Sequence, residues 1–205
     1  MSFPMPDLDP TVTLASESNP RTIFHRVYRQ GKDPLTPSTS GNSRYDCPPT
    51  SPVKFGVLYL GYDLPTCWME TIVRSNMIRP AGTDIPVATN EVRTRWSCQI
   101  SSDGPLVLAQ FADEALIDLG DSASNIMGDS YLRTRVWSAL LNAHANPQVD
   151  ALRYRSRFNS GQFCVALFDR AIASKGLRTH DHHSLDPATS REAQSIMRRY
   201  KVVPI

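Results

Sequence analysis

The sequence predicts an α+β protein with a single domain built around a mixed or antiparallel sheet. The length of 205 residues suits one domain that buries a sizeable core. A composition of 40% hydrophobic and 20% charged residues is typical of a globular protein. Strand patterns outnumber helix patterns and do not alternate with them regularly, which argues against a doubly wound fold. We expect a flexible, Pro/Ser/Asp-rich arm over residues 1–20 and one domain over residues 21–205.

Strands are predicted where apolar residues alternate with polar ones or form a continuous run. Residues 22–30, "TIFHRVYRQ", alternate in a way that gives a strand two different faces. The run "QFCVALFDR" at residues 162–170 is apolar enough for a buried strand. The Arg-rich segment "DALRYRSR" at residues 150–157 indicates a charged edge strand, which could support a homodimer. Further strands are expected at residues 56–63, 94–101 and 105–111.

Three helices are predicted, and a long loop precedes the first of them. Residues 63–77 begin with Asp63 as a helix cap and Pro65 in the first turn. Residues 190–205 are read as a short basic helix followed by a tail. Residues 31–52 are expected to form a loop, and loops of that length are usually functional or disordered. The strongest helix, residues 129–145, carries one apolar stripe made by Leu132, Val136, Leu140 and Leu141.

Charge, hydropathy and cysteine usage exclude several classes of protein. A net charge of +2 and an isoelectric point near 8.4 argue against nucleic acid as the main ligand. No apolar run approaches the roughly 18 residues that span a bilayer, and the first residues do not have the pattern of a signal peptide. The four cysteines are scattered without a C-x-x-C motif, so we expect reduced thiols in a cytoplasmic protein.

Common catalytic motifs are absent from the sequence. There is no P-loop, no G-x-G-x-x-G, no H-E-x-x-H and no G-x-S-x-G. The run "HDHH" at residues 180–183 lies in a polar segment, where neighbouring histidines do not converge easily on one ion. We interpret it as a solvated loop and expect no metal.

A set of Arg, Tyr, Glu and Ser residues remains, spread over the predicted strands, the long loop and the first helix. Taken one at a time, each has a simple structural explanation, since strand tyrosines usually pack in the core and helix glutamates are usually solvated. Their spacing alone does not define a site. The set comprises Arg26, Tyr28, Arg44, Tyr45, Tyr59, Glu70 and Ser156.

Four segments that contain these residues resemble, in order, the RES domain family. They read "IFHRVY", "SRYDCPP", "GVLYLGYDLPTCWMETIV" and "DALRYRSRFNSGQFCVALF", and together they span residues 22–170. The resemblance implies a fold like that of ADP-ribosyltransferase toxins. It also implies a bacterial toxin that degrades NAD+ and is neutralised by an Xre-like helix-turn-helix antitoxin. Neither direct nucleic-acid binding nor membrane association is expected.

The family's characteristic residues can be carried over one by one. Its early arginine corresponds to Arg26, its second arginine to Arg44, its strand tyrosine to Tyr59, its glutamate to Glu70 and its serine to Ser156.

Two departures from the family pattern concern the loop and the second strand. Ser43 stands where the family usually has Gly, and Asp46 where it usually has Asn, while the strand reads "YLGYD" rather than "YLA". A carboxylate at Asp46 would repel phosphate unless it turns away or pairs with Arg44. If the two pair, Arg44 is a structural brace and Arg26 the main phosphate ligand.

The chemistry implied by the resemblance gives each residue a role. Cleaving the bond between nicotinamide and ribose passes through an oxocarbenium-like transition state, which the Glu70 carboxylate would stabilise. Arginines suit the pyrophosphate, tyrosine rings could stack on the nicotinamide, and Ser156 would hydrogen-bond ribose or phosphate. The catalytic set is Glu70, Arg26, Tyr59 and Ser156, and the NAD+-binding set is Arg26, Tyr28, Arg44, Tyr45, Tyr59, Ser156 and Arg157.

Other functions remain open at this stage. NAD+ is expected as a substrate, with no cofactor, and either water or inorganic phosphate could accept the ADP-ribosyl group. The same fold could instead transfer ADP-ribose to a macromolecule. A third alternative is a non-catalytic binding module that docks a partner on the basic helix "REAQSIMRRYK".

Overall fold

The computed structural model describes residues 16–17, 22–74, 80–128, 130–144 and 148–205. Its main feature is one large mixed sheet. Its eight strands follow the order β1-β6-β7-β8-β3-β2-β5-β9. The pair β6–β7 is parallel, and the other neighbours are antiparallel. These strands are β1 (Ser16–Glu17), β2 (Phe24–Arg29), β3 (Val57–Gly61), β5 (Arg95–Ser101), β6 (Leu106–Gln110), β7 (Ala151–Arg155), β8 (Phe163–Phe168) and β9 (Arg178–Ser184).

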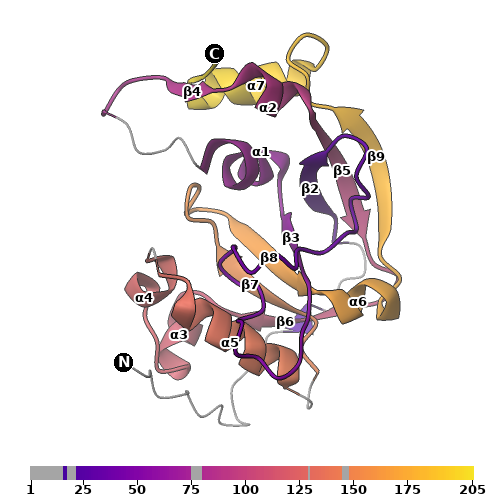
Figure 1. Cartoon of the computed structure of the whole chain (residues 1–205), viewed down its shortest axis with the longest axis vertical. Coiled ribbons are helices and arrows are strands. Elements are labelled where there is room, and N and C mark those ends of the chain that lie inside the picture. Colours follow the sequence, from indigo (N-terminus) through magenta and orange to yellow (C-terminus); the bar gives the residue numbers. More distant parts are fainter. Residues whose placement is uncertain (1–15, 18–21, 75–79, 129, 145–147) are drawn as a thin grey trace.

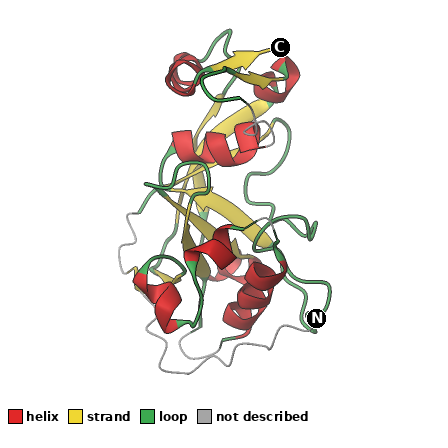
Figure 2. Cartoon of the chain, turned by 90° about the vertical axis from the view of Figure 1, so that its left-hand side faces the viewer, coloured by secondary structure: helices red, strands yellow, loops and turns green. Residues whose placement is uncertain are grey.

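Helices gather at the two ends of this sheet. Figure 1 shows α1, α2 and α7 near the C-terminus at one end and α3, α4 and α5 at the other. Seen from the side, the strands run between these two groups (Figure 2). A parallel pair, β4 (Ile85–Val87) and β10 (Val202–Pro204), lies beside α7. The helices are α1 (Leu64–Trp68), the π-helix η1 (Met69–Val73), α2 (Thr89–Arg93), α3 (Glu114–Asp118), α4 (Ala123–Met127), α5 (Leu132–Ala143), α6 (Asp169–Ser174) and α7 (Arg191–Tyr200).

Most predicted elements are confirmed, including the mixed sheet in one α+β domain. The first helix begins as expected, because the Asp63 carboxylate accepts a hydrogen bond from the Thr66 N–H at 2.7 Å. Close packing of this helix on β3 requires Gly61, where an added Cβ would lie 2.7 Å from the Cys67 Sγ. Of the predicted arm, only Ser16 and Glu17 are described, and they pair with β6. The other residues of the predicted arm lie outside the described residues.

The predicted apolar stripe of α5 is confirmed only in part, because Leu141 is fully buried and Leu140 packs against the core, whereas Leu132 lies outside the buried face. Leu132 is 62% exposed, whereas Thr134, Trp137, Ser138 and Leu141 are buried. The buried face carries hydroxyls because Thr134 and Ser138 donate hydrogen bonds to backbone carbonyls of the long loop. The face of α5 that is buried is therefore determined by hydrogen bonds to the loop carbonyls as well as by hydrophobic packing.

Three further predictions differ from the structure. The segment β7 lies between β6 and β8, so it is not an edge strand and gives no basis for self-association. Its arginines are accommodated over the Phe163 ring, with the Arg153 and Arg155 guanidinium carbons 4.0 and 4.4 Å from the ring centroid. The "HDHH" run belongs to strand β9 rather than a loop, and the predicted C-terminal tail forms β10.

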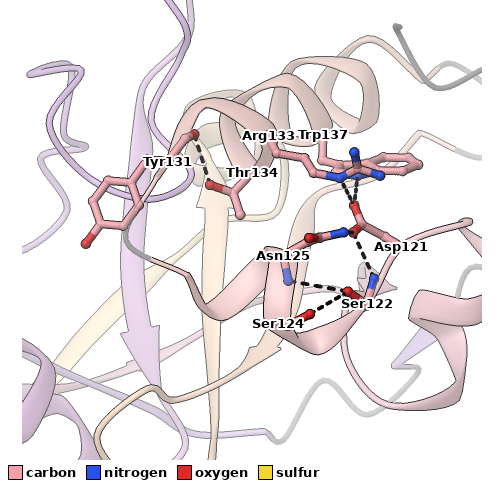
Figure 3. A network of polar contacts seen from close by, with 8 residues as sticks. All are labelled: Asp121, Ser122, Ser124, Asn125, Tyr131, Arg133, Thr134 and Trp137. Carbon is pink, nitrogen blue, oxygen red and sulfur yellow. Dashed lines mark hydrogen bonds and ion pairs between the residues drawn. The ribbon is translucent and has the colours of Figure 1, made fainter. Parts of the chain in front are cut away.

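A buried carboxylate, Asp121, holds α4 and α5 together. Its Oδ2 accepts hydrogen bonds from Arg133 Nε at 2.5 Å and Trp137 Nε1 at 2.7 Å. Its Oδ1 accepts from the Ser122 N–H and the Asn125 amide. Burial alone would raise the pKa of Asp121, but these hydrogen bonds outweigh it and lower the pKa. Figure 3 shows the Tyr131 ring projecting from the start of α5 on the side away from this cluster.

Replacing Asp121 with Asn should destabilise the fold in a pH-dependent way. At pH 7, Asp121→Asn should lower the free energy of unfolding by about 1–3 kcal/mol, because a neutral amide cannot accept all four donors. A lowered pKa means that the carboxylate contributes fully above pH ~4 and loses its contribution as the pH falls through the folded-state pKa. The two proteins should therefore converge in acid during denaturant titrations. The exposed Asp118→Asn is the control, and a gap that does not vary with pH would contradict this account.

Candidate functional site

A pocket of about 690 Å³ opens between the two groups of helices, with strands β2 and β3 in its wall. Its volume is in the range of small-molecule sites. Positive charge dominates, because eight cationic but only two acidic side chains line it, together with four tyrosines. The cations are Arg26, Arg29, Lys32, Arg44, Arg74, Arg95, Arg155 and Arg157, the acids are Asp33 and Glu70, and the tyrosines are Tyr28, Tyr59, Tyr131 and Tyr154.

Glu70 is brought to this wall by the π-helix η1. Short π-helical segments occur often at functional sites, since the wider turn redirects side chains. Its Oε1 accepts a hydrogen bond from the Ser156 hydroxyl at 2.6 Å and another from the Arg157 N–H at 2.9 Å. No donor among the described residues reaches Oε2. One carboxylate oxygen is therefore fixed by the protein, and the other is available to the pocket.

Ser156 lies behind Glu70 and does not line the pocket. Its exposed fraction is 0%, and its Oγ also accepts hydrogen bonds from the N–H groups of Phe158 and Asn159. The Asn159 side chain in turn donates to the Thr66 hydroxyl of α1 at 2.9 Å. The predicted contact between Ser156 and a ligand is thus not formed by this geometry. Ser156 instead orients the carboxylate.

Arg26 extends from β2 to the long loop. Its guanidinium donates to the Pro34 carbonyl and, at 3.0 Å, to the Thr36 carbonyl. Burial lowers the pKa of Arg26 to about 10. Among the described residues no carboxylate forms an ion pair with it. A partly buried positive charge that faces a pocket and has only neutral carbonyl partners favours the binding of an anion.

Asp46 turns into the protein and organises the loop from inside. Its carboxylate is fully buried and does not line the pocket. Oδ2 accepts from the hydroxyls of Ser38 and Ser40 and from the N–H groups of Asn42 and Ser43, at 3.0–3.2 Å. Of the two alternatives for this departure from the family pattern, the carboxylate turns away, and no ion pair with Arg44 forms among the described residues.

Arg44 is held at the opposite wall by α4 and α5. Its guanidinium donates to the Ile126 carbonyl and lies 5.3 Å from the centroid of the Tyr131 ring. The backbone around it is fixed from α5, since Thr134 donates to the Arg44 carbonyl at 2.7 Å and Arg135 donates to the Ser43 carbonyl at 3.0 Å. The loop therefore presents Arg44 from a rigid base.

The predicted tyrosines occupy three different positions. The Tyr59 ring lines the pocket, but its hydroxyl donates to Asp46 Oδ1 at 2.9 Å and accepts from the Tyr45 N–H at 3.0 Å. Burial and the nearby Asp46 charge raise the pKa of Tyr59. Tyr45 is fully buried against Tyr154, with ring centroids 4.5 Å apart, so it is not brought to the pocket. Tyr28 lines the pocket and contacts His182 Nδ1 through its hydroxyl at 2.9 Å.

Sequence reasoning missed eight of the charged and tyrosine side chains in the wall, namely Arg29, Lys32, Asp33, Arg74, Arg95, Tyr131, Tyr154 and Arg155. Tyr154 precedes Ser156 by two residues in a strand, and Arg74 follows Glu70 by four, so periodicity offered a signal for these two. Tyr131 and Arg95 come from segments that approach the pocket only through the fold. Arg157, which was predicted in the NAD+-binding set, does line the pocket.

Other features of the chain bear on what the site can hold. The described residues contain no group of three or more His, Cys, Asp or Glu side chains arranged to hold a metal ion. The four cysteines are free thiols. Among the described helices, none is long and apolar enough to cross a membrane.

Comparisons with known proteins agree with this architecture. The family model of the RES domain matches residues 20–187. A chain in the crystal structure of the M. tuberculosis MbcT–MbcA toxin–antitoxin complex superposes with a TM-score of 0.62. It is 15% identical, over 89% of this chain and 91% of that one. No curated protein matches in sequence. The prediction of an α+β domain with the fold of the RES family is confirmed.

Removing the Asp46 carboxylate should loosen the loop that carries Arg44. In Asp46→Ala the buried N–H and hydroxyl groups lose their acceptor, so the free energy of unfolding should fall by about 1–3 kcal/mol or more. Limited proteolysis should then cut within residues 31–52 faster than in the unaltered protein. The exposed Asp84→Ala serves as the control. Unchanged stability together with unchanged loop cleavage would show that Asp46 does not organise the loop.

Proposed function

This chain belongs to the RES domain family, and we propose that it is an NAD+-degrading toxin that cleaves the bond between nicotinamide and ribose. One observation carries the proposal. The Glu70 carboxylate is held by Ser156 and the Arg157 N–H at the wall of a pocket lined by arginines and tyrosines. Such a pocket suits an anionic dinucleotide whose reacting centre becomes positively charged.

The reaction needs charge stabilisation more than proton transfer. When the C–N bond breaks, its electron pair stays on the nicotinamide nitrogen, which neutralises the pyridinium and leaves positive charge on the ribose. A fixed carboxylate near that carbon stabilises the charge as it develops. Water then forms a new C–O bond and releases a proton to solvent, which gives ADP-ribose. With inorganic phosphate as the acceptor, the product is ADP-ribose 1-phosphate.

Two arginines are proposed to bind the pyrophosphate. Arg26 uses some of its N–H groups for the Pro34 and Thr36 carbonyls and has others left for phosphate oxygens. Arg44 faces the same pocket from the opposite wall. Guanidinium groups bind phosphate by paired, charge-assisted hydrogen bonds. The two would hold the middle of the dinucleotide and present its ribose to Glu70.

Aromatic side chains complete the proposed site. Tyr28, Tyr131 and Tyr154 offer ring surfaces to the pocket, and a flat nicotinamide or adenine ring stacks on such surfaces. Tyr59 contributes its ring face while its hydroxyl stays bonded to Asp46. Ser156 and Tyr45 act indirectly, as positioning residues for Glu70 and for the Arg44 loop.

A protein antitoxin is the proposed partner. The family resemblance implies an Xre-like helix-turn-helix protein, and the toxin–antitoxin complex among the similar structures supports a partner of this kind. The free thiols fit action in the reducing cytoplasm, where NAD+ is available. Co-expression of the gene that neighbours this one should relieve the growth arrest described below if it encodes the antitoxin.

Expression in bacteria should deplete NAD+ in a manner that depends on Glu70. Inducing the unaltered protein should lower cellular NAD+ and stop growth, whereas Glu70→Gln should do neither. Losing a charge aimed at the transition state typically costs about 10²–10³-fold in rate. The exposed Glu114→Gln on α3 is the matched control and should remain toxic. NAD+ should be measured in extracts alongside the amount of soluble protein.

Two outcomes would replace the proposal with an alternative. If soluble, folded protein leaves NAD+ unchanged and does not bind it in calorimetry, a non-catalytic binding module is the better account. If labelled NAD+ in a lysate leaves its label on protein or nucleic acid rather than on free ADP-ribose, the chain is an ADP-ribosyltransferase. Retained toxicity in Glu70→Gln would contradict the role of Glu70.

A further inference from the structure

A second group of positive charges lies in the pocket wall, apart from Arg26 and Arg44. Arg29 on β2 and Arg95 on β5 are directly opposite each other in the antiparallel register. Like charges in that arrangement destabilise a sheet. One carboxylate, Glu91, bridges them, with Oε2 at 2.9 Å from Arg29 and Oε1 accepting from Arg95. The pair therefore retains an excess of positive charge.

Arg95 is unusually buried for an arginine. Its exposed fraction is 9%, and its Nε has no hydrogen-bond partner among the described residues. Burial, together with the charges of Arg29 and Arg74, lowers the pKa of Arg95 to about 10. Buried guanidinium groups are normally paired and fully hydrogen-bonded. Three guanidinium groups share the single carboxylate of Glu91, and this excess of positive charge at the pocket wall points to a missing anion.

Arg74 completes the group from the end of η1. It follows the last residue of that helix and is exposed. Arg29, Arg74 and Arg95 all line the same pocket as Glu70. The three residues will be called the arginine cluster. Its members come from β2, β5 and the end of η1, so it forms only in the folded protein.

The charge of the pocket exceeds what NAD+ requires. The pyrophosphate carries two negative charges, which Arg26 and Arg44 match under the proposed function. The arginine cluster, with one bridging carboxylate, is left without a ligand group. A phosphate monoester has close to two negative charges and three terminal oxygens at neutral pH, and arginine is the usual ligand of the adenosine 2′-phosphate in dinucleotide sites.

We propose that the arginine cluster binds the 2′-phosphate of NADP+, so that the pocket takes NADP+ in preference to NAD+. The inference rests on the proposed function, because it assigns the dinucleotide class for the same site. The reaction is unchanged: the bond between nicotinamide and ribose breaks with its electron pair on nicotinamide. Water supplies the new C–O bond and releases a proton, which gives 2′-phospho-ADP-ribose.

Binding measurements can test the cluster without turnover. Full-length Glu70→Gln protein is titrated with NADP+ and with NAD+ in a calorimeter. NADP+ should bind about tenfold more tightly, since charge-assisted hydrogen bonds to one added phosphate commonly reach that size. Adding Arg29→Gln and Arg74→Gln should lower the ratio of NADP+ to NAD+ affinity about tenfold. Arg95 is left unaltered because its burial makes misfolding a risk.

A matched control changes the same number of charges outside the pocket. Arg93 and Arg178 are exposed and form surface ion pairs with Asp186 and Asp103. Arg93→Gln with Arg178→Gln should leave the affinity ratio unchanged. Melting temperatures of all variants establish that they are folded.

Three results would overturn the assignment. The first is equal affinity for the two dinucleotides, and the second is an equal loss of both affinities in the cluster variant. The third is binding of inorganic phosphate that depends on the cluster without any preference for NADP+, which would assign the cluster to free phosphate. Release of nicotinamide by the unaltered protein is measured separately. Its absence would contradict the proposed function, whereas the affinity ratio tests the cluster alone.

Discussion

The hydrogen bond from the Ser156 hydroxyl to the Glu70 carboxylate, 2.6 Å long, joins two distant segments of the chain at the site. Glu70 lies in a π-helix that follows α1, and Ser156 begins the turn that follows β7. Without the Ser156 hydroxyl the Glu70 side chain would have several accessible rotamers, so this hydrogen bond is needed to fix the position of the carboxylate. The same turn is tied to α1 through Asn159 and Thr66. The turn after β7 therefore both positions the Glu70 carboxylate and packs against α1.

A second constraint separates the acidic and basic residues of the long loop. Asp46 points inward, where four donors of the loop and the Tyr59 hydroxyl satisfy its carboxylate. Arg44, two residues earlier, points to the pocket and is braced by Ile126. Asp46 therefore does not neutralise Arg44. Its carboxylate instead stabilises the loop that carries Arg44. Unlike a solvated turn, this segment is hydrogen-bonded from both α5 and β3.

Local signals predicted the strands β2, β3 and β5 to β8 and the capped first helix, because hydrophobic period and helix caps depend on neighbouring residues. They did not predict β9, which is polar and exposed, or β10. The direction of Asp46 was not predictable, since its donors include Tyr59 on a strand beyond the loop. Leu132 was misjudged because Thr134 and Ser138 are buried to bind loop carbonyls, which no apolar pattern reveals. Arg95 and Tyr131 reach the pocket only through tertiary packing. Family resemblance identified Glu70 and Ser156 as site residues, and the structure places Glu70 at the pocket wall and buries Ser156 behind it.

The most direct measurement of the central claim is product analysis with the purified, unaltered protein. NAD+ labelled in the adenine ring is incubated with the protein, with and without inorganic phosphate, and all products are separated by chromatography. The account predicts one free nicotinamide for each NAD+ consumed. The label should appear in ADP-ribose or, with phosphate, in its 1-phosphate. Intact NAD+ after prolonged incubation with folded protein, or cleavage at the pyrophosphate to give labelled AMP, would contradict it.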